Sequence, residues 1–427
     1  MMGELFRTQT QRKTPMAEKH DPYAAFRISD YRIYVIGWLV ALMGTRIQTV
    51  AISWEMYQRT GQALSLGLVG LTLAIPTMLF ALPAGYLADR FERRKLVMLS
   101  LAGMTLTSLG LAYLSYTQGS TALMYGMLFL DATAIVLGRP ARTAMLPQIV
   151  PREVFPNAVT WNTTLMQLAS VIGPALGGLV IVYSVSASYV VCALGSLFFI
   201  VILTRLHYRP GPRPSQPRNL DTLLQGVKFV WDERILFTLM SLDLFAVLLG
   251  GAVYLLPIFA TDILKAGATG YGWLQAAPAA GSGLMALALV YLPPMRRAGR
   301  TLLLAIAGFG VATIVFGFST WFSLSWAMLF LTGALDNISM VVRQTLTQLL
   351  TPDEMRGRVS AVSSIFIGAS NELGGLESGL VAQYFGPVFS VVSGGIGTLL
   401  VVATAALLSP RLLAIDKLHE TKPERVG

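Results

Sequence analysis

Five ionisable side chains stand inside long apolar stretches of the sequence, where they could carry protons. Arg46, Asp131, Asp243, Asp336 and Glu372 fall near the middle of these stretches when a rise of about 1.5 Å per residue is assumed. Burial disfavours the charged form of a carboxyl group and a nearby guanidinium favours it, so a change of exposure can load or release a proton. Asp131 and Asp336 are the leading candidates for this chemistry.

Two interpretations of Arg46 and Asp131 remain open. In the first, Arg46 holds Asp131 ionised until substrate or a conformational change separates them. In the second, the two residues form a permanent ion pair that only ties two helices together. A structural role is favoured for Asp243, which lies nearer one end of its stretch, and Glu372 is a candidate proton or cation site.

The stretches that carry these residues are long enough to cross a lipid bilayer. The 427-residue chain has a mean hydropathy of +0.62 and only 13% charged residues, against about a quarter in soluble domains. Twelve mostly apolar stretches reach the roughly 20 residues that a spanning helix needs. They cover residues 33–57, 66–88, 96–116, 120–145, 157–183, 187–206, 234–259, 270–292, 301–319, 322–348, 358–383 and 388–408. Because they lack the alternation of barrel strands, the predicted fold is an all-α integral membrane protein.

The basic residues are distributed by side of the membrane. Of the 32 Lys and Arg residues, all but Arg46, Arg59 and Lys265 fall in the two tails and in alternate loops or the helix ends beside them. By the positive-inside rule, both termini and the long central loop are cytoplasmic. The net charge of +10 therefore reports topology and contact with membrane lipids, and nucleic acid is not an expected partner.

The chain divides into two halves of six helices. We predict a cytoplasmic N-terminal segment with an interfacial helix (1–32), a six-helix bundle (33–206), a cytoplasmic linker with an amphipathic helix (207–233), a second six-helix bundle (234–408) and a cytoplasmic tail (409–427). A constant shift of 201 residues places Gly173 on Gly374 and Asp131 one helical turn from Asp336. Repeated helical halves of this kind are typical of secondary transporters.

A charged loop between the second and third stretches carries the first motif, "GYLADRFERRKL". Its residues Gly85, Asp89, Arg90, Arg93 and Arg94 match the signature G-x-L-a-D-R-x-G-R-R, with Glu92 in place of the usual glycine. With this motif the chain resembles the major facilitator superfamily over nearly its whole length. The form with Glu92, and the stretch 138–180, look like a bacterial exporter branch that includes enterobactin exporters.

The resemblance implies a role for this loop in gating. In that family the loop latches the cytoplasmic side shut when the cavity faces outward, so Asp89 would meet the positive end of the helix that begins near Arg358, with Arg139 or Arg142 nearby. The alternative is that the basic residues only mark a cytoplasmic loop. The corresponding loop of the second half, "PPMRRAGR", lacks an aspartate, so any latch is asymmetric. A gating role is weakly favoured for Arg142.

The second motif is "GPALGG" in the fifth stretch, with Gly173, Pro174, Gly177 and Gly178. It resembles the signature of drug/proton antiporters. Its glycines allow two helices to approach closely, and the proline removes one backbone hydrogen bond and bends the helix. Generic packing of small residues is the alternative.

Enzyme classes find no support in the motifs. The chain has no "GK" pair for a phosphate-binding loop and no H-E-x-x-H motif for zinc, so no cofactor and no metal are expected. We predict a monomeric secondary active transporter of the bacterial inner membrane. It would move a small amphipathic molecule or drug outward in exchange for protons, by alternating access. The alternatives are a dedicated exporter of a siderophore or other specific metabolite, and a uniporter without proton coupling. Four carboxylates against one Arg near mid-depth favour cationic or zwitterionic substrates.

Overall fold

The computed structural model describes residues 21–207, 220–292, 297–352 and 355–409, and the regular structure in that part of the chain is helical without strands. The first half contains η1 (Ala24–Arg27), α1 (Ser29–Thr60), α2 (Ala63–Arg90), α3 (Arg93–Tyr116), α4 (Thr121–Ile149), α5 (Phe155–Tyr183) and α6 (Val185–Arg205). The second half contains α7 (Leu220–Asp232), α8 (Arg234–Leu249), η2 (Gly251–Leu255), α9 (Leu256–Ile258), η3 (Phe259–Ile263), α10 (Gly267–Tyr291), α11 (Ala298–Phe318), α12 (Phe322–Leu350), α13 (Arg356–Phe385) and α14 (Pro387–Leu408).

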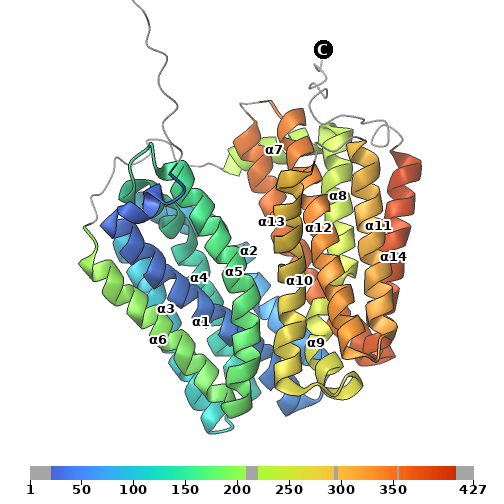
Figure 1. Cartoon of the computed structure of the whole chain (residues 1–427), viewed down its shortest axis with the longest axis horizontal. Coiled ribbons are helices and arrows are strands. Elements are labelled where there is room, and N and C mark those ends of the chain that lie inside the picture. Colours follow the sequence, from blue (N-terminus) through green and yellow to red (C-terminus); the bar gives the residue numbers. More distant parts are fainter. Residues whose placement is uncertain (1–20, 208–219, 293–296, 353–354, 410–427) are drawn as a thin grey trace, which may run out of the picture.

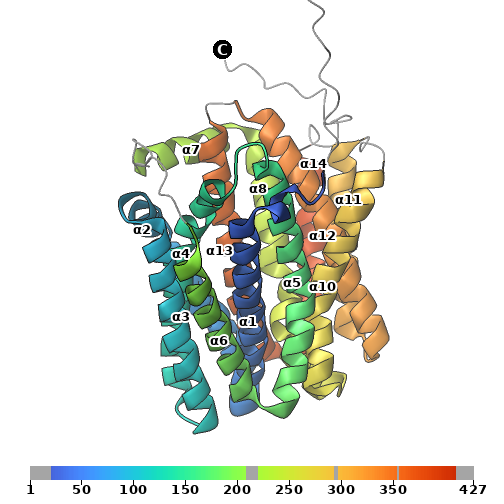
Figure 2. The ribbon, with the colours of Figure 1, turned by 60° about the vertical axis from the view of Figure 1, so that its left-hand side comes forward.

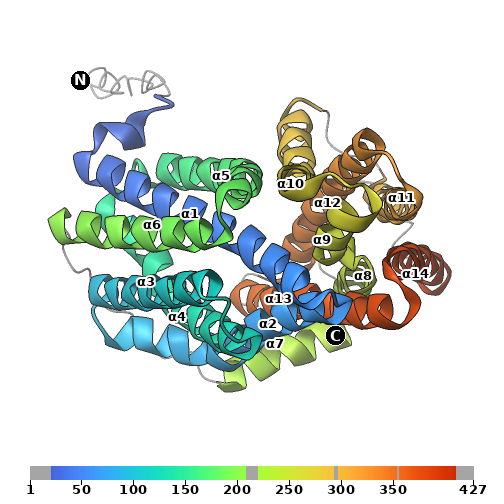
Figure 3. The same ribbon diagram turned by 90° about the horizontal axis from the view of Figure 1, so that it is seen from below.

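Each of the twelve predicted stretches falls on one long helix or, for the seventh, on the run Ile235–Ile263. Within the described residues, eleven spans are long and apolar enough to cross a bilayer. The remaining stretch corresponds to α13, which has 30 residues, is not among those eleven, and packs beside α2 in the middle of the molecule (Figure 3). The protein is therefore an all-α, multi-pass membrane protein, as predicted.

Local sequence signals set several of the helix ends. Gly61 ends α1 with a φ of +63°, and Gly386 separates α13 from α14 with a φ of +91°, conformations that suit glycine. Ser120 and Ser184 precede α4 and α6, and each side chain accepts a hydrogen bond from a backbone N–H of the first turn. These short turns make consecutive helices antiparallel.

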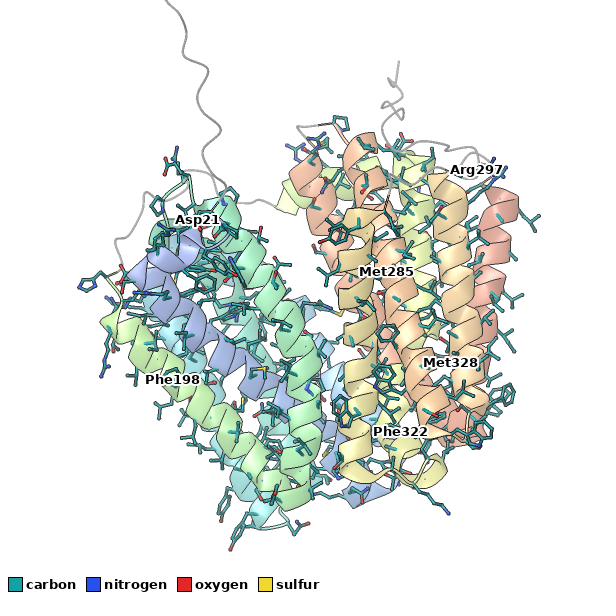
Figure 4. The ribbon with its side chains drawn as sticks, viewed as in Figure 1. Asp21, Phe198, Met285, Arg297, Phe322 and Met328 are labelled. Carbon is teal, nitrogen blue, oxygen red and sulfur yellow. The ribbon has the colours of Figure 1, made fainter. Side chains whose placement is uncertain are left out.

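The helices form two groups that stand side by side, α1 to α6 and α8 to α14 (Figure 1). The groups approach each other at one end and diverge toward the end that carries α7. Asp21 and Arg297 also lie at the α7 end, whereas Phe322 lies at the other end (Figure 4). Contacts between the groups run chiefly along α2 with α13 and α5 with α10.

The seventh span is broken in the middle. α8 stops at Gly250, a 3-10 turn and a π-helical turn follow, and Pro257 lies between them. Because these turns interrupt the α-helical bonding pattern, α8 loses regular partners for its last carbonyl groups. Gly374 of α13 and Gly394 of α14 bring their backbones against the carbonyls of residues 247–249, where a side chain would collide. Glycine on neighbouring helices thus accommodates the break.

Large apolar side chains cover the outside of both groups. Phe198 on α6 points away from the bundle (Figure 4), and Leu99, Leu106, Leu304 and Leu407 are exposed on other helices. Such a surface is compatible with lipid rather than water.

Several predicted segments lie partly outside the described residues. Those parts are 1–20 of the N-terminal segment, 208–219 of the linker and 410–427 of the tail. The described part of the linker includes α7, where the sequence predicts an amphipathic helix.

Candidate functional site

Asp131 lies in the interior of the first half and is only 2% exposed. Its carboxyl group accepts a hydrogen bond from Gln48 Nε2 of α1 at 3.0 Å and lies 2.6 Å from Thr107 Oγ1 of α3. Gln48 in turn accepts a hydrogen bond from Ser108 at 2.7 Å, so polar groups link α1, α3 and α4. Within the described part of the chain, no basic residue forms an ion pair with Asp131.

Arg46 does not meet Asp131. Successive residues of a helix are rotated by about 100°, so positions 46 and 48 lie on nearly opposite sides of α1. Gln48 faces Asp131, whereas the Arg46 side chain packs against Gly173 of α5. The ion pair that both interpretations of the sequence assumed is therefore not observed, because depth along the helix does not determine which side a residue faces. Arg46 Nε is buried without a hydrogen-bond partner.

Arg343 of α12 brings two of the predicted carboxylates together. It forms an ion pair with Asp243 of α8, and its other terminal nitrogen lies 3.9 Å from Asp336 Oδ1. The side chains of Asp243 and Arg343 are 10% and 13% exposed, whereas that of Asp336 is 52% exposed. In the sequence, Arg343 lies near a cytoplasmic helix end, where pairing in a gate and simple cytoplasmic charge could not be told apart, and its pairing with Asp243 was not predicted. The seven-residue spacing of Asp336 and Arg343, two turns on one face, was the available signal.

This cluster borders a cavity between α8, α12 and α13. The cavity has a volume of 290 Å³, and its lining mixes polar and apolar side chains, including Asp243, Arg343, Met340, Gln344, Ser363 and Phe366. That volume is near the lower end of small-molecule sites, which span about 300–1,000 Å³. A void of 20 Å³ between α8, α11 and α12 is bordered by Asp243, Asp336, Ser339 and Arg343. It has room for about one water molecule.

The two candidate proton carriers therefore have unlike surroundings. Asp131 is enclosed among the helices of its own half, while Asp336 is half exposed and close to an arginine. The internal repeat matches their positions but not their environments.

The arginines of the loop motif bind neighbouring elements of their own half. Arg93 donates to the carbonyl of Ala144 on α4 at 3.1 Å, and Arg94 donates to the carbonyls of residues 204 and 206 at the end of α6. Arg90 donates to the hydroxyl of Tyr86, one turn earlier on α2. These contacts fix the loop against the first half.

The other gate candidates stand apart in this conformation. Asp89 forms no ion pair with a described residue, and the space around Gly85 is open. Arg139 is exposed, and the Arg142 guanidinium lies 5.9 Å from the ring centre of Trp38, a cation–π distance. The expected contact between Asp89 and the start of α13 is not formed here.

The glycines of the second motif lie at two helix contacts. Gly173 and Gly177 face α1, where a Cβ atom on Gly173 would collide with the stem of Arg46. Gly178 faces α10, where its backbone approaches Gly272 across the boundary between the halves. Pro174 lies between these contacts within α5. The motif thus joins α5 both to its own half and to the other half.

Polar and aromatic contacts close the end of the molecule opposite α7. The Tyr57 hydroxyl donates to Asp262, Trp54 stacks on Tyr271 at 5.6 Å, and the Leu64 amide donates to the side chain of Gln383. These contacts were not predicted from the sequence, because contacts between distant helices leave no local pattern.

Near that end, Arg59 binds within the first half. It pairs with Glu55 at 2.5 Å and donates to the carbonyls of Leu114, Ser115 and Gly119, so it caps the end of α3. Glu55 also accepts a hydrogen bond from Tyr189 at 2.7 Å. A 630 Å³ pocket opens beside them, but the Arg59 donors already have partners.

Glu372 belongs to α13, but its side chain lies outside the described part of the structure. Among the residues searched in the described ranges, no group of three potential metal ligands occurs.

Comparison with known proteins adds the family context. A family model described as transmembrane secretion effector matches residues 20–425. The chain is 27% identical over 399 residues to the enterobactin exporter EntS of Shigella boydii serotype 18 (strain CDC 3083-94 / BS512), covering 92% of this chain and 94% of that protein. The enterobactin exporter EntS of Escherichia coli O1:K1 / APEC shows the same identity and coverage.

Solved structures share the architecture at low sequence identity. An inward-facing, occupied bacterial homologue of the human lysosomal transporter Spinster aligns with a TM-score of 0.71 at 13% identity, over 93% of this chain and 99% of that one. An inward-facing bacterial homologue of the iron transporter ferroportin aligns with a TM-score of 0.69 at 14% identity, over 88% of this chain and 98% of that one. At such identity the likeness establishes the fold alone.

Proposed function

The chain belongs to the transmembrane secretion effectors of the major facilitator superfamily, transporters rather than enzymes, and we propose that it exports a small amphipathic molecule in exchange for protons. Export proceeds by alternating access across the bacterial inner membrane, with both termini in the cytoplasm, and the transporting unit is a monomer. The distribution of basic residues supports this orientation, since Asp21, Arg297 and α7 share one end of the molecule (Figure 4).

The conformation described above is one that opens to the cytoplasm. The contacts of Tyr57, Trp54 and Leu64 with the second half support this, because they close the end opposite α7. In the reverse state Asp89 meets the start of α13 and closes the cytoplasmic side. In this arrangement α7 lies at the cytoplasmic membrane surface. It belongs to the 207–233 linker, which joins the 33–206 bundle to the 234–408 bundle.

Proton coupling is supported chiefly by the carboxyl group of Asp131, which is buried and forms no ion pair with a described residue. An ionised carboxylate without a cation is costly inside a membrane protein, so burial favours the protonated form of Asp131, while the hydrogen bonds from Gln48 and Thr107 favour the ionised form. A rearrangement of α1 or α3 that hydrates it releases the proton. Asp336, half exposed beside Arg343, is the second carrier.

Hydrogen-bond counting supports the same assignment. The Thr107 hydroxyl has one proton, yet it lies 3.0 Å from the Gly103 and Met104 carbonyls as well as 2.6 Å from Asp131 Oδ1. With an ionised Asp131, the Thr107 hydroxyl donates to the carboxylate. With a protonated Asp131, the carboxyl group donates to Thr107 Oγ1 and Thr107 donates to a carbonyl of its own helix, so the same contacts accommodate Asp131 with or without its proton.

Transport by proteoliposomes tests the proposal. Under an imposed pH gradient, the parent protein should accumulate substrate against its concentration gradient, whereas Asp131→Asn should lose accumulation and keep substrate exchange. Asp336→Asn is measured in parallel, with a lipophilic cation and a catecholate as test substrates. Gradient-driven transport by both variants at the parent rate would refute the assignment and leave a uniporter as the remaining mechanism.

Export of a siderophore is the second candidate function. It is favoured by the two relatives named as enterobactin exporters, which align with nearly the whole chain. The charges that the structure leaves accessible fit a siderophore substrate better than the acidic cavity predicted from the sequence. Asp131 is sequestered and Asp243 is neutralised by Arg343, so two of the four carboxylates expected to make the cavity acidic no longer do so.

A further inference from the structure

We propose that Asp131 exchanges its proton with the outside through the interior of the first half, along a route that begins at Glu55 and passes Tyr189 and Ser188 of α6. The inference rests on the proposed antiport function and names the path that its protons take. Along this route protons reach Asp131 without entering the space between the two halves, which stays available to the substrate.

The route begins in the 630 Å³ pocket at the end of the first half opposite α7, which faces the outside in the proposed orientation. Glu55, Arg59 and Ser184 belong to the pocket lining, and the Glu55 side chain is only 5% exposed. Arg59 pairs with one carboxylate oxygen of Glu55, while the other oxygen accepts a hydrogen bond from the fully buried Tyr189. Glu55 thus joins the pocket to a hydroxyl group in the interior.

The interval between Glu55 and Asp131 is short and mostly apolar. Gln48, which binds Asp131, precedes Glu55 by seven residues, so Gln48 and Glu55 leave α1 on the same face, about 10 Å apart along its axis. Ile52 of α1 and Leu111 of α3, one turn outward of the hydroxyl that binds Gln48, are buried in one apolar cluster in this interval. A proton therefore crosses it only with the help of polar groups on another helix.

The helix that supplies these groups is α6, which packs against both α1 and α3 (Figure 2). Ser188 lies one turn outward of Cys192, and Cys192 lies near Asp131. Ser188 is fully buried, and its hydroxyl has no hydrogen-bond partner among the described residues. Buried hydroxyl groups normally have a partner in protein or water. Ser188, next to Tyr189 in the chain, thus marks the point where a water molecule enters the interval.

The transfer needs only these groups and water. Glu55 takes up a proton from the pocket and passes it to the Tyr189 oxygen, while the hydroxyl proton of Tyr189 moves to the water at Ser188. That water gives a proton to Asp131, so Glu55, Tyr189 and the water return to their starting states. Entry of one water molecule requires only a small shift of α6 against α1, so access from the outside opens and closes with conformation, as coupling requires.

Hydrogen–deuterium exchange of the Asp131 carboxyl group tests the route without any substrate. In infrared spectra of the purified protein at mildly acidic pH, the C=O stretching band that Asp131→Asn removes belongs to protonated Asp131, and its shift after mixing with heavy water gives the exchange rate. Tyr189→Phe should slow the exchange at least about a hundredfold, the lower end of what a positioned proton-transfer group contributes. Ser188→Ala should slow it about 2–10-fold, the equivalent of one hydrogen bond to water.

The matched control is Ser196→Ala. Ser196 lies on the same face of α6, one turn from Cys192 toward the cytoplasm, and is fully buried with a hydroxyl that also has no partner in the described part of the chain. It lies on the cytoplasmic side of Asp131, so its loss should leave the exchange rate unchanged. Because neither serine hydroxyl has a protein partner to lose, both alanine variants should fold, and they decide the test even if Tyr189→Phe does not fold.

The possible outcomes separate the route from the antiport mechanism. Equal exchange rates in the parent and Ser188→Ala overturn the route and leave antiport through Asp131 standing. Slower exchange in Ser196→Ala than in Ser188→Ala also overturns it, because access would then come from the cytoplasmic side. If Asp131→Asn removes no band, Asp131 takes up no proton, and the route falls together with the proposed antiport through Asp131.

Discussion

Removing Arg343 should destabilise the second half more than removing its partner Asp243. Both side chains are largely buried, and Arg343 is the cation that neutralises Asp243. Arg343→Gln leaves a buried carboxylate without a cation, a change that typically costs about 3–5 kcal/mol. Asp243→Asn leaves Arg343 with Asp336, 3.9 Å away and half exposed, so the expected cost is only the roughly 1.5–3 kcal/mol of a charged hydrogen bond.

The double variant Asp243→Asn/Arg343→Gln sharpens this prediction. With neither charge present, no uncompensated group remains, so the double variant should be more stable than Arg343→Gln alone by at least about 1.5 kcal/mol. Thermal unfolding of detergent-solubilised protein, followed by size-exclusion chromatography, ranks the variants. At about 2–4 °C per kcal/mol for a unit of this size, the gap between Arg343→Gln and the double variant should be at least about 3 °C. Additive losses, or a larger loss for Asp243→Asn, would refute the ion-pair reasoning.

Three further predictions address other parts of the structure. Gly178→Val should weaken the contact between α5 and α10, because the new side chain meets backbone atoms that cannot move aside. A lower cross-linking yield between cysteines placed on these two helices would show the weakened contact, and an unchanged yield would contradict the prediction. Tyr57→Phe removes the hydrogen bond to Asp262 and should shift the conformational equilibrium toward the outward-open state by about 0.5–1.5 kcal/mol. Thiol labelling of a cavity cysteine from outside measures this shift, with the exposed-site variant Tyr113→Phe as control. Equal labelling of Tyr57→Phe and the parent counts against the prediction. Arg59→Met leaves Glu55 buried without a cation and leaves carbonyl groups at the end of α3 without a donor. It should therefore lower the free energy of unfolding by about 3–5 kcal/mol. A loss below about 1 kcal/mol would mean that the Arg59–Glu55 pair is not needed for stability.

The helical architecture could be predicted because hydrophobicity acts locally along the chain. Predicted stretches such as 33–57 and 322–348 correspond to α1 at Ser29–Thr60 and α12 at Phe322–Leu350. The break of the seventh span was not predicted, because Gly250 and Pro257 interrupt a run that remains apolar throughout.

The contacts of the site were harder to predict, because they depend on which side of a helix each residue faces. Sequence depth correctly selected Arg46 and Asp131 as buried or partly buried groups, yet the two positions point to different neighbours. The pairing of Arg343 with Asp243 was not predicted, because the two residues lie 100 positions apart. Neutral partners such as Gln48 and Thr107 gave no signal, since polar uncharged residues are common in spanning helices.

The most direct test of proton exchange by Asp131 is a measurement of protons released when substrate binds. Purified protein in weakly buffered detergent solution is mixed with 2,3-dihydroxybenzoate, and the pH change is followed with a soluble indicator, with Asp131→Asn and the exposed-site variant Arg152→Gln in parallel. The parent and Arg152→Gln should release protons on binding, while Asp131→Asn should bind the probe and release fewer or none. Equal release by Asp131→Asn and the parent would contradict it.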